Sequence, residues 1–197
     1  MIKAIIFDCF GVFIGNPYKI RAEDLERKSP EKYIELSDIN HASDRGYISN
    51  QESVTRMSEI FGITPEQFLS EQKNGEVQNL ELIDYAKNLR PEYKLGMLSN
   101  VSSRERLDMR FTPGQLDELF DVVVASGEEG VIKPEPRIFE IACERLGMLP
   151  EECVFIDDIL ENCEAAESLG MNAIQYISVH QCVTDLEALI DRGEKTD

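Results

Sequence analysis

Five short, mostly apolar runs constrain the fold of this chain more than any other feature of its sequence. They occupy residues 4–7, 95–98, 122–124, 154–156 and 173–177, and stretches with helical patterns separate most of them. A nearly continuous apolar run is typical of a strand that is buried on both faces of a parallel sheet. Helices that connect such strands complete βαβ units. The pattern therefore predicts an α/β fold with a doubly wound parallel sheet.

A long helical stretch, residues 16–90, separates the first strand-like run from the second. Its apolar residues recur at helical spacing, and residues 64–67 (Thr-Pro-Glu-Gln) are typical of a capped helix start. We therefore predict a core made of residues 1–15 and 91–197, with residues 16–90 inserted as a small helical cap. An insertion at this point lies over the carboxyl ends of the strands, where such folds bind ligands. We expect it to act as a lid.

The composition narrows the class of protein. A length of 197 residues suits one domain with a modest insertion, and the net charge of −18 argues against nucleic acid and anionic membranes as partners. The five cysteines show no C-x-x-C spacing, which argues against a disulfide framework and a structural zinc site. No targeting or membrane-spanning segment is visible. We therefore expect a cytoplasmic protein, and nothing in the sequence indicates its oligomeric state.

Polar side chains follow the first two strand-like runs. Asp8 has apolar neighbours, so its ionised carboxylate needs a cation or hydrogen-bond donors to offset its desolvation. Ser99 and Asn100 could bind an oxyanion through a hydroxyl, an amide and backbone N–H groups. Each site also has a structural interpretation. Asp8 could cap a turn, and Ser99-Asn100 could belong to a turn before a helix that Ser102 and Glu105 cap.

Two further candidate sites follow later in the chain. Lys133 precedes Pro134, which we predict opens a helix. A Lys at a helix N-terminus meets the positive end of the helix dipole, so either an anion or full solvation is needed to explain it. Asp157 and Asp158 follow the fourth run, and a helix cap at Asp158 explains only one of the two carboxylates. Adjacent strands bring both near Asp8, where oxygen ligands and like charges favour Mg²⁺.

Taken together, these sites resemble the motifs of one enzyme superfamily. The matching segments are residues 5–12, 98–100, 132–139 and 155–162. In this order and spacing they resemble the haloacid dehalogenase-like (HAD) hydrolases, whose core is Rossmann-like, over nearly the whole chain. Within that superfamily, the chain is similar to the branch of small sugar-phosphate phosphatases and the phosphatase domain of soluble epoxide hydrolase. Residues 45–49 resemble a turn in the helical cap of that branch.

The resemblance implies a nucleophile and a magnesium site. Asp8 attacks phosphorus and forms an aspartyl-phosphate. Its other carboxylate oxygen, the backbone carbonyl of Phe10 and the carboxylate of Asp158 bind Mg²⁺. Asp157 orients the waters of the metal and the catalytic lysine, and Asn162 braces the metal loop.

The resemblance also implies how the phosphate is bound. Ser99 and Asn100 hold phosphate oxygens, while Lys133 compensates their charge. The expected substrate is a small phosphorylated metabolite, such as a sugar phosphate. Its identity depends on the cap, where Asn16, Tyr18, Arg21 and Arg45 are candidate contacts.

Phe10 departs from the pattern of the superfamily. Most of its phosphatases have a second Asp at this position as general acid and base, a group typically worth about 10²–10⁴ in rate. If no other group replaces it, aryl phosphates should be hydrolysed faster than alkyl or sugar phosphates. A residue of the cap, or a hydroxyl of the substrate, could take over the proton transfer and remove this difference.

Two alternative functions remain open. Dehalogenase relatives carry an aromatic residue at the position of Phe10, which favours a 2-haloacid dehalogenase, but they lack the paired carboxylates of Asp157 and Asp158. The second alternative is a catalytically weak binding or regulatory protein with the same fold. The intact Asp8, Lys133 and Asp158 argue against it, because a binding protein has no need to keep all three.

Overall fold

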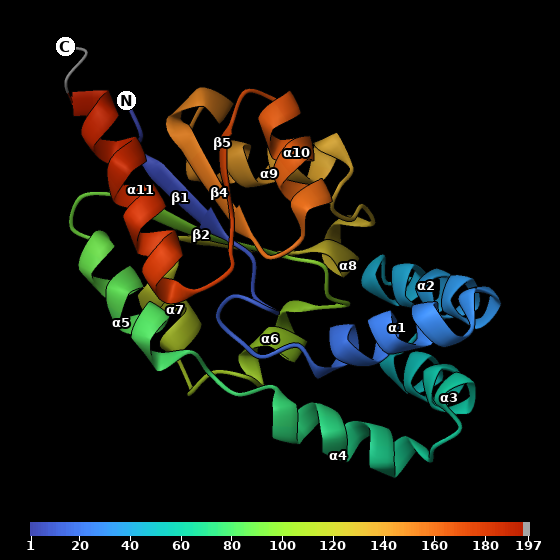
Figure 1. Ribbon diagram of the computed structural model, residues 1–197. Coiled ribbons are helices and arrows are strands. Elements are labelled where there is room, and N and C mark those ends of the chain that lie inside the picture. The colour runs from blue at the N-terminus through green and yellow to red at the C-terminus, as the bar shows by residue number, and fades with distance from the viewer. Residues whose placement is uncertain (195–197) are drawn as a thin grey trace.

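The strand-like runs form one five-stranded sheet in the computed structural model, which describes residues 1–194, with side chains through residue 191. The strands are β1 (Ala4–Phe7), β2 (Lys94–Ser99), β3 (Val122–Ala125), β4 (Cys153–Asp157) and β5 (Asn172–Gln175). Their order is β3-β2-β1-β4-β5, and every neighbouring pair is parallel. The predicted parallel sheet is confirmed, and its first strand lies at the centre (Figure 1).

Helices cover both faces of the sheet, which explains why the strands are apolar without alternation. On one face lie α5 (Leu80–Leu89), α7 (Gln115–Leu119) and α11 (Val179–Glu194). The opposite face carries α9 (Pro136–Leu146) and α10 (Leu160–Ser168). Successive residues of β1 enter the two clusters in turn, because side chains of a strand alternate between faces. The predicted doubly wound arrangement is therefore confirmed.

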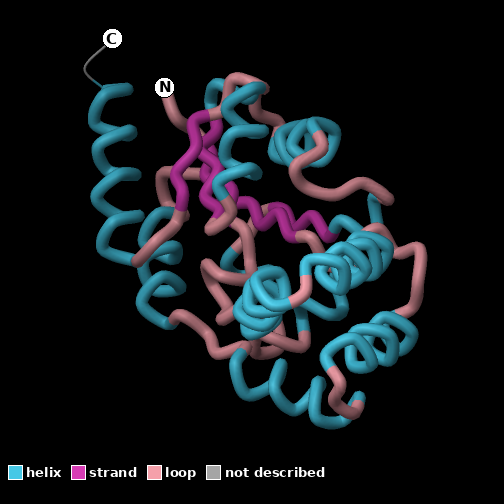
Figure 2. The backbone as a smooth tube through the Cα atoms, turned by 45° about the vertical axis from the view of Figure 1, so that its right-hand side comes forward, coloured by secondary structure: helices cyan, strands magenta, loops and turns pink. Residues whose placement is uncertain are grey.

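Four helices between β1 and α5 form a separate layer beyond the carboxyl ends of the strands (Figures 1 and 2). They are α1 (Pro17–Lys28), α2 (Pro30–Asp44), α3 (Asn50–Phe61) and α4 (Pro65–Gly75). They share a small apolar cluster made of Ala22, Leu36, Ile39, Val54, Met57 and Phe68. This layer is the predicted helical cap inserted after the first strand. Among the described residues, no helix is both long and apolar enough to cross a membrane.

The division into core and cap stays a prediction, but packing indicates where the cap ends. Leu82, Ile83 and Ala86 of α5 belong to the apolar cluster of the sheet and not to that of α1–α4. We therefore propose that the cap ends before α5, near Gly75, whereas the sequence places the boundary at residue 90.

Two predicted helix starts are wrong. The helix expected at Pro134 is α9 and begins at Pro136, because a proline at 136 disfavours helical geometry at Glu135, which is extended with φ −63° and ψ 131°. Likewise, Ser103 caps α6 (Arg104–Asp108) instead of Ser102, and its hydroxyl accepts from the backbone N–H of Arg106. By contrast, the capping box of Thr64 and Gln67 at α4 is confirmed. The remaining short helices are α8 (Ser126–Glu129) and η1 (Pro150–Glu152).

Candidate active site

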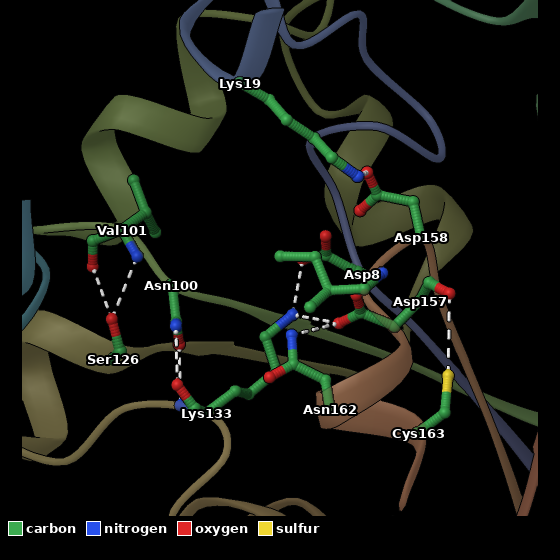
Figure 3. A network of polar contacts seen from close by, with 11 residues as sticks. Asp8, Lys19, Asn100, Val101, Ser126, Lys133, Asp157, Asp158, Asn162 and Cys163 are labelled. Carbon is green, nitrogen blue, oxygen red and sulfur yellow. Dashed lines mark hydrogen bonds and ion pairs between the residues drawn. The ribbon is translucent and has the colours of Figure 1, made fainter. Parts of the chain in front are cut away.

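The register of the central strands brings three candidate residues together at the carboxyl edge of the sheet. Phe7 of β1 pairs with Ile156 of β4, so Asp8 and Asp157 follow side by side. The Lys133 ammonium lies between their carboxylates, with its Nζ 2.7 Å from Asp8 Oδ1 and 2.7 Å from Asp157 Oδ2 (Figure 3). All three side chains are buried. From the sequence, either a bound anion or full solvation could explain Lys133. In the structure, its ammonium is buried and has two carboxylate partners.

The electrostatics of this group follow from its burial. Desolvation raises the pKa of Asp8 to about 7; Lys133 opposes this shift, while Asp157 and Asp158 reinforce it. Burial also disfavours the charge on Lys133, but the carboxylates of Asp157 and Asp8 outweigh that effect and raise its pKa above the ordinary value. The three carboxylates of Asp8, Asp157 and Asp158 meet two ammonium groups, Lys133 and Lys19 of α1, and the remaining negative charge suits a further cation.

Asp157 is fixed by its neighbours. The Lys133 ammonium and the Asn162 amide both donate to its Oδ2, the amide at 3.0 Å, and the backbone N–H of Ile159 donates to its Oδ1 at 2.8 Å. Asn162, in the first turn of α10, is 4% exposed and so tightly enclosed. Asp157 is thus held by three donors and holds the lysine in turn.

Asp158 points toward the cap and is not the cap residue of the following helix. Its Oδ2 accepts from the Lys19 ammonium of α1 at 2.6 Å, while its Oδ1 is buried with no hydrogen-bond partner among the described residues (Figure 3). Burial raises the pKa of Asp158, and Lys19 opposes the shift. Asp8, Asp157 and Asp158 offer carboxylate oxygens that all lie within 4.8 Å of one another. An unpaired buried oxygen in such a set is typical of a site for a hard cation.

Gly11 makes this arrangement possible and was not identified from the sequence. Its φ is +94°, and a Cβ atom there would lie 2.4 Å from Asp158 Oδ2. Such a contact is far below van der Waals distance, and the backbone conformation is one that residues other than glycine rarely adopt. The loop after β1 can therefore approach the carboxylate only with glycine at this position.

Ser99 and Asn100, at the end of β2, differ in how their side chains are used. The Ser99 hydroxyl is fully buried, and its Oγ has no hydrogen-bond partner among the described residues. The Asn100 amide is occupied, because its Nδ2 donates to the carbonyl of Lys133 and its Oδ1 accepts from the N–H of Lys133. Asn100 thus fixes the backbone that carries the lysine, whereas the Ser99 hydroxyl has no partner within the described part of the chain.

Comparison with known proteins identifies the family. The model of the haloacid dehalogenase-like hydrolases matches residues 2–170. The chain belongs to this family. A HAD-like family hydrolase from Porphyromonas gingivalis has a similar structure, with 30% identity, a TM-score of 0.73 and coverage of 96% of this chain and 98% of that one. The HAD resemblance seen in the sequence is confirmed.

Two further relatives bear on the site of this HAD-family chain. A HAD family enzyme from Bacteroides thetaiotaomicron, solved with magnesium and inorganic phosphate, is 25% identical, with a TM-score of 0.70 and coverage of 91% and 96%. A phosphorylated carbohydrates phosphatase from Thermotoga maritima is 34% identical over 113 residues, or 57% of this chain and 50% of that protein. The chain spans at most half the length of the first curated relatives that it matches.

In this HAD-family chain a cavity of about 600 Å³ lies between the cap and the carboxyl edge of the sheet. Asp8, Lys133 and Ser99 line it from the core, together with Phe10. From the cap it is lined by Gln72, a residue that is 5% exposed and whose Nε2 has no hydrogen-bond partner among the described residues. On both sides the cavity is therefore lined by a residue with a buried polar atom that has no hydrogen-bond partner among the described residues.

The four cap residues suggested by the sequence divide into two pairs. Asn16 and Tyr18 line the cavity. Arg21 instead binds Glu71 within the cap and lies over the ring of Phe61, and Arg45 forms an ion pair with Glu135 of the core. Neither arginine is among the described residues that line the cavity.

Sequence reasoning missed two charged cap residues of the site, Lys19 and Asp44. Lys19 is the third residue of α1, so it is a cation at the unfavourable end of a helix, which is the signal that drew attention to Lys133. Asp44, the last residue of α2, lines the cavity and directly precedes the Arg45-Gly46 turn. Only the folding of α2 against the core brings it to the site.

Proposed function

We propose that this chain is a Mg²⁺-dependent phosphatase that hydrolyses a small phosphate monoester through an aspartyl-phosphate on Asp8. The observation that carries the proposal is the buried Lys133 ammonium, which bridges Asp8 and Asp157 at the floor of a cavity. A carboxylate held beside a cation, with a face open to the cavity, is suited to nucleophilic attack on a phosphoryl group.

The residues fit a magnesium ion. Asp8, Asp158 and the backbone carbonyl of Phe10 would hold it, and the unpaired Oδ1 of Asp158 supports this role. When bound, Mg²⁺ supplies positive charge that offsets the phosphoryl oxygens. The Bacteroides thetaiotaomicron relative with magnesium and phosphate supports the same assignment. Asp157 supports the site by holding Lys133, and Asn162 supports it by donating to Asp157.

The remaining groups bind phosphate and orient the nucleophile. The Ser99 hydroxyl donates to a phosphoryl oxygen, which satisfies a group that is otherwise buried without a partner. Asn100 contributes its backbone N–H, since its side chain already holds Lys133. Lys133 neutralises the charge that develops as Asp8 attacks.

The substrate is a small phosphorylated metabolite with a polar leaving group, such as a sugar phosphate. The Gln72 amide, on the cap side of the cavity, needs an acceptor such as a hydroxyl. A cavity of about 600 Å³ is large enough for a metabolite of this size. The carbohydrate phosphatase of Thermotoga maritima supports the same substrate class. The cap, as a lid, would exclude water and choose among substrates.

Assays with and without metal test this function against the dehalogenase alternative. Hydrolysis of 4-nitrophenyl phosphate should fall by about 10²-fold or more in EDTA and recover with added Mg²⁺, since the metal stabilises the transition-state charge. Incubation with 2-chloropropionate should release no chloride. Undiminished hydrolysis in EDTA contradicts the metal site. Chloride release contradicts the phosphatase assignment and favours a dehalogenase, for which the aromatic Phe10 is suited.

A further inference from the structure

The end of α2 is fastened to the core at the edge of the cavity. The Ser126 hydroxyl of α8 donates to the backbone carbonyl of Asp44 at 2.6 Å, and the following residue, Arg45, forms its ion pair with Glu135. At Gly46 the chain passes so close to α8 that a Cβ atom would lie 2.7 Å from the carbonyl oxygen of Gly127. Figure 1 shows α2 ending beside α8. Asp44 is therefore held in place from the core side.

The Asp44 side chain faces the same cavity as Asp8. It lines the cavity with Asp8, Lys133 and Phe10, and its Oδ2 accepts from the Asn40 amide at 2.8 Å. An amide donor orients the carboxyl group without neutralising it, unlike an ion pair. Asp44 is thus a positioned carboxyl group with no ion-pair partner at salt-bridge distance within the described part of the chain.

Charged groups from several elements surround Asp44. Burial raises its pKa to about 7, which Arg106 of α6, Lys133 and the Asn40 amide oppose and Asp8 reinforces. The phenol of Tyr18 of α1 faces it as well, because Asp44 contributes to the raised pKa of that group. A carboxyl group whose pKa is near 7 can both donate and accept a proton at ordinary pH, as general acid and base catalysis requires.

We propose that Asp44 is the general acid and base of the phosphatase reaction and replaces, from the cap, the carboxylate that Phe10 lacks. The inference rests on the proposed phosphatase function. It explains how a chain with Phe10 can act on alkyl or sugar phosphates, whose alkoxides leave poorly without a proton.

The proton transfers balance over the two steps. In the first, an Asp8 carboxylate oxygen forms a bond to phosphorus while the bond to the ester oxygen breaks. The ester oxygen keeps the electron pair, takes the proton of the Asp44 carboxyl group and leaves as the alcohol. In the second, the Asp44 carboxylate takes a proton from water as that water attacks phosphorus. The bond from Asp8 to phosphorus then breaks, phosphate leaves, and both side chains return to their initial states.

The test compares Asp44→Asn with the wild type on a graded series of phosphate esters. Asp44→Asn should lower kcat/KM, which reports the transfer to Asp8 and not the later hydrolysis step, by about 10²-fold or more for an alkyl phosphate, but by no more than about threefold for 4-nitrophenyl phosphate. Nitrophenolate leaves without a proton, so its hydrolysis also reports that the variant is folded. Asp38→Asn, on the same helix but exposed and outside the cavity, is the matched control and should leave both rates unchanged.

Two further readouts distinguish proton transfer from a structural role. The wild-type kcat/KM for the alkyl ester should fall as pH rises through the pKa of Asp44, because the acid form that the first step needs is lost, and Asp44→Asn should lack this fall. In the Asp44→Asn background, Phe10→Asp should recover at least about tenfold on the alkyl ester. If Asp44→Asn is unstable, the alkaline fall in the wild type still tests the proposal.

The outcomes separate this inference from the proposed function. A wild type that hydrolyses no phosphate ester with Mg²⁺ overturns both. If the wild type is active, equal losses of kcat/KM on alkyl and aryl esters in Asp44→Asn overturn the assignment of Asp44 alone. So does a wild-type kcat/KM for alkyl esters that stays level as pH rises from 6 to 8.5.

Discussion

Gly11 is the residue at which the geometry of the site is most sensitive to a single added atom. Gly11→Ala would place a Cβ 2.4 Å from Asp158 Oδ2 and displace that carboxylate. We expect the Mg²⁺ concentration for half-maximal activity to rise by about tenfold or more, since support of a metal ligand is typically worth 10–100-fold. A titration of activity with Mg²⁺ measures this change.

Gly114→Ala is the control for backbone strain. Gly114 also has a positive φ, +82°, but no atom lies within 4 Å of the position of its Cβ. Both substitutions should lower the free energy of unfolding by about 1–2 kcal/mol. A Gly11→Ala protein with the magnesium response of the wild type would show that Asp158 is not the ligand.

At the residue scale, the sequence indicated charged side chains where chain position alone determined their environment, and their roles stay predictions. Asp8, Asp157 and Lys133 were identified because charged side chains follow buried strands or precede prolines, where desolvation requires a partner. Lys19 and Asp44 lie on cap helices, where a charged residue is ordinary, and only the docking of the cap gives them a role. The use of the Asn100 amide by the Lys133 backbone also depends on a contact between distant segments.

At the level of elements, Ser126 joins cap helix α2 to the core. Its hydroxyl accepts from the N–H of Val101 at 2.9 Å (Figure 3). It also donates to the carbonyl of Asp44. Ser126→Ala would leave both backbone groups without this partner and should lower the free energy of unfolding by about 1–3 kcal/mol. Urea unfolding measures the loss. The alkyl-ester rate should also fall more than the aryl-ester rate, because Asp44 is less firmly held.

Ser168→Ala is the matched control, since the exposed Ser168 hydroxyl donates only to the carbonyl of Glu164 within α10. Its free energy of unfolding should change by less than about 0.5 kcal/mol. Equal stabilities of the two variants would mean that the link through Ser126 contributes nothing to cap docking.

The starts of helices could be predicted from capping residues and prolines only where a single such signal was present. The Thr64-Gln67 box starts α4 as expected. At α9 two prolines compete for the start, and the second prevails because it forces Glu135 out of the helical region. α6 begins at Arg104 with Ser103 as its N-cap, while the Ser102 backbone packs against α8, where its carbonyl oxygen would lie 2.2 Å from a Cβ at Gly127.

At the scale of the whole molecule, the parallel sheet was predictable because nearly continuous apolar runs are specific to strands with two covered faces. The packing of α5 on the sheet was not, since an amphipathic helix does not reveal which partner covers it. The cavity could not be predicted from the sequence either, because it depends on how the cap helices pack against the core. Its lining comes from segments on α1, α2, α3 and α4 and from four strand ends of the core.

The central claim, that Asp8 is the nucleophile of a phosphatase, is tested most directly by the turnover of 4-nitrophenyl phosphate with Mg²⁺ by purified Asp8→Asn. The amide is nearly isosteric with the carboxylate, and circular dichroism confirms that the protein is folded. We predict that kcat falls by about 10³-fold or more, because no other group can form the covalent intermediate. Turnover within a few fold of the wild type would contradict the account, since another group would then attack phosphorus.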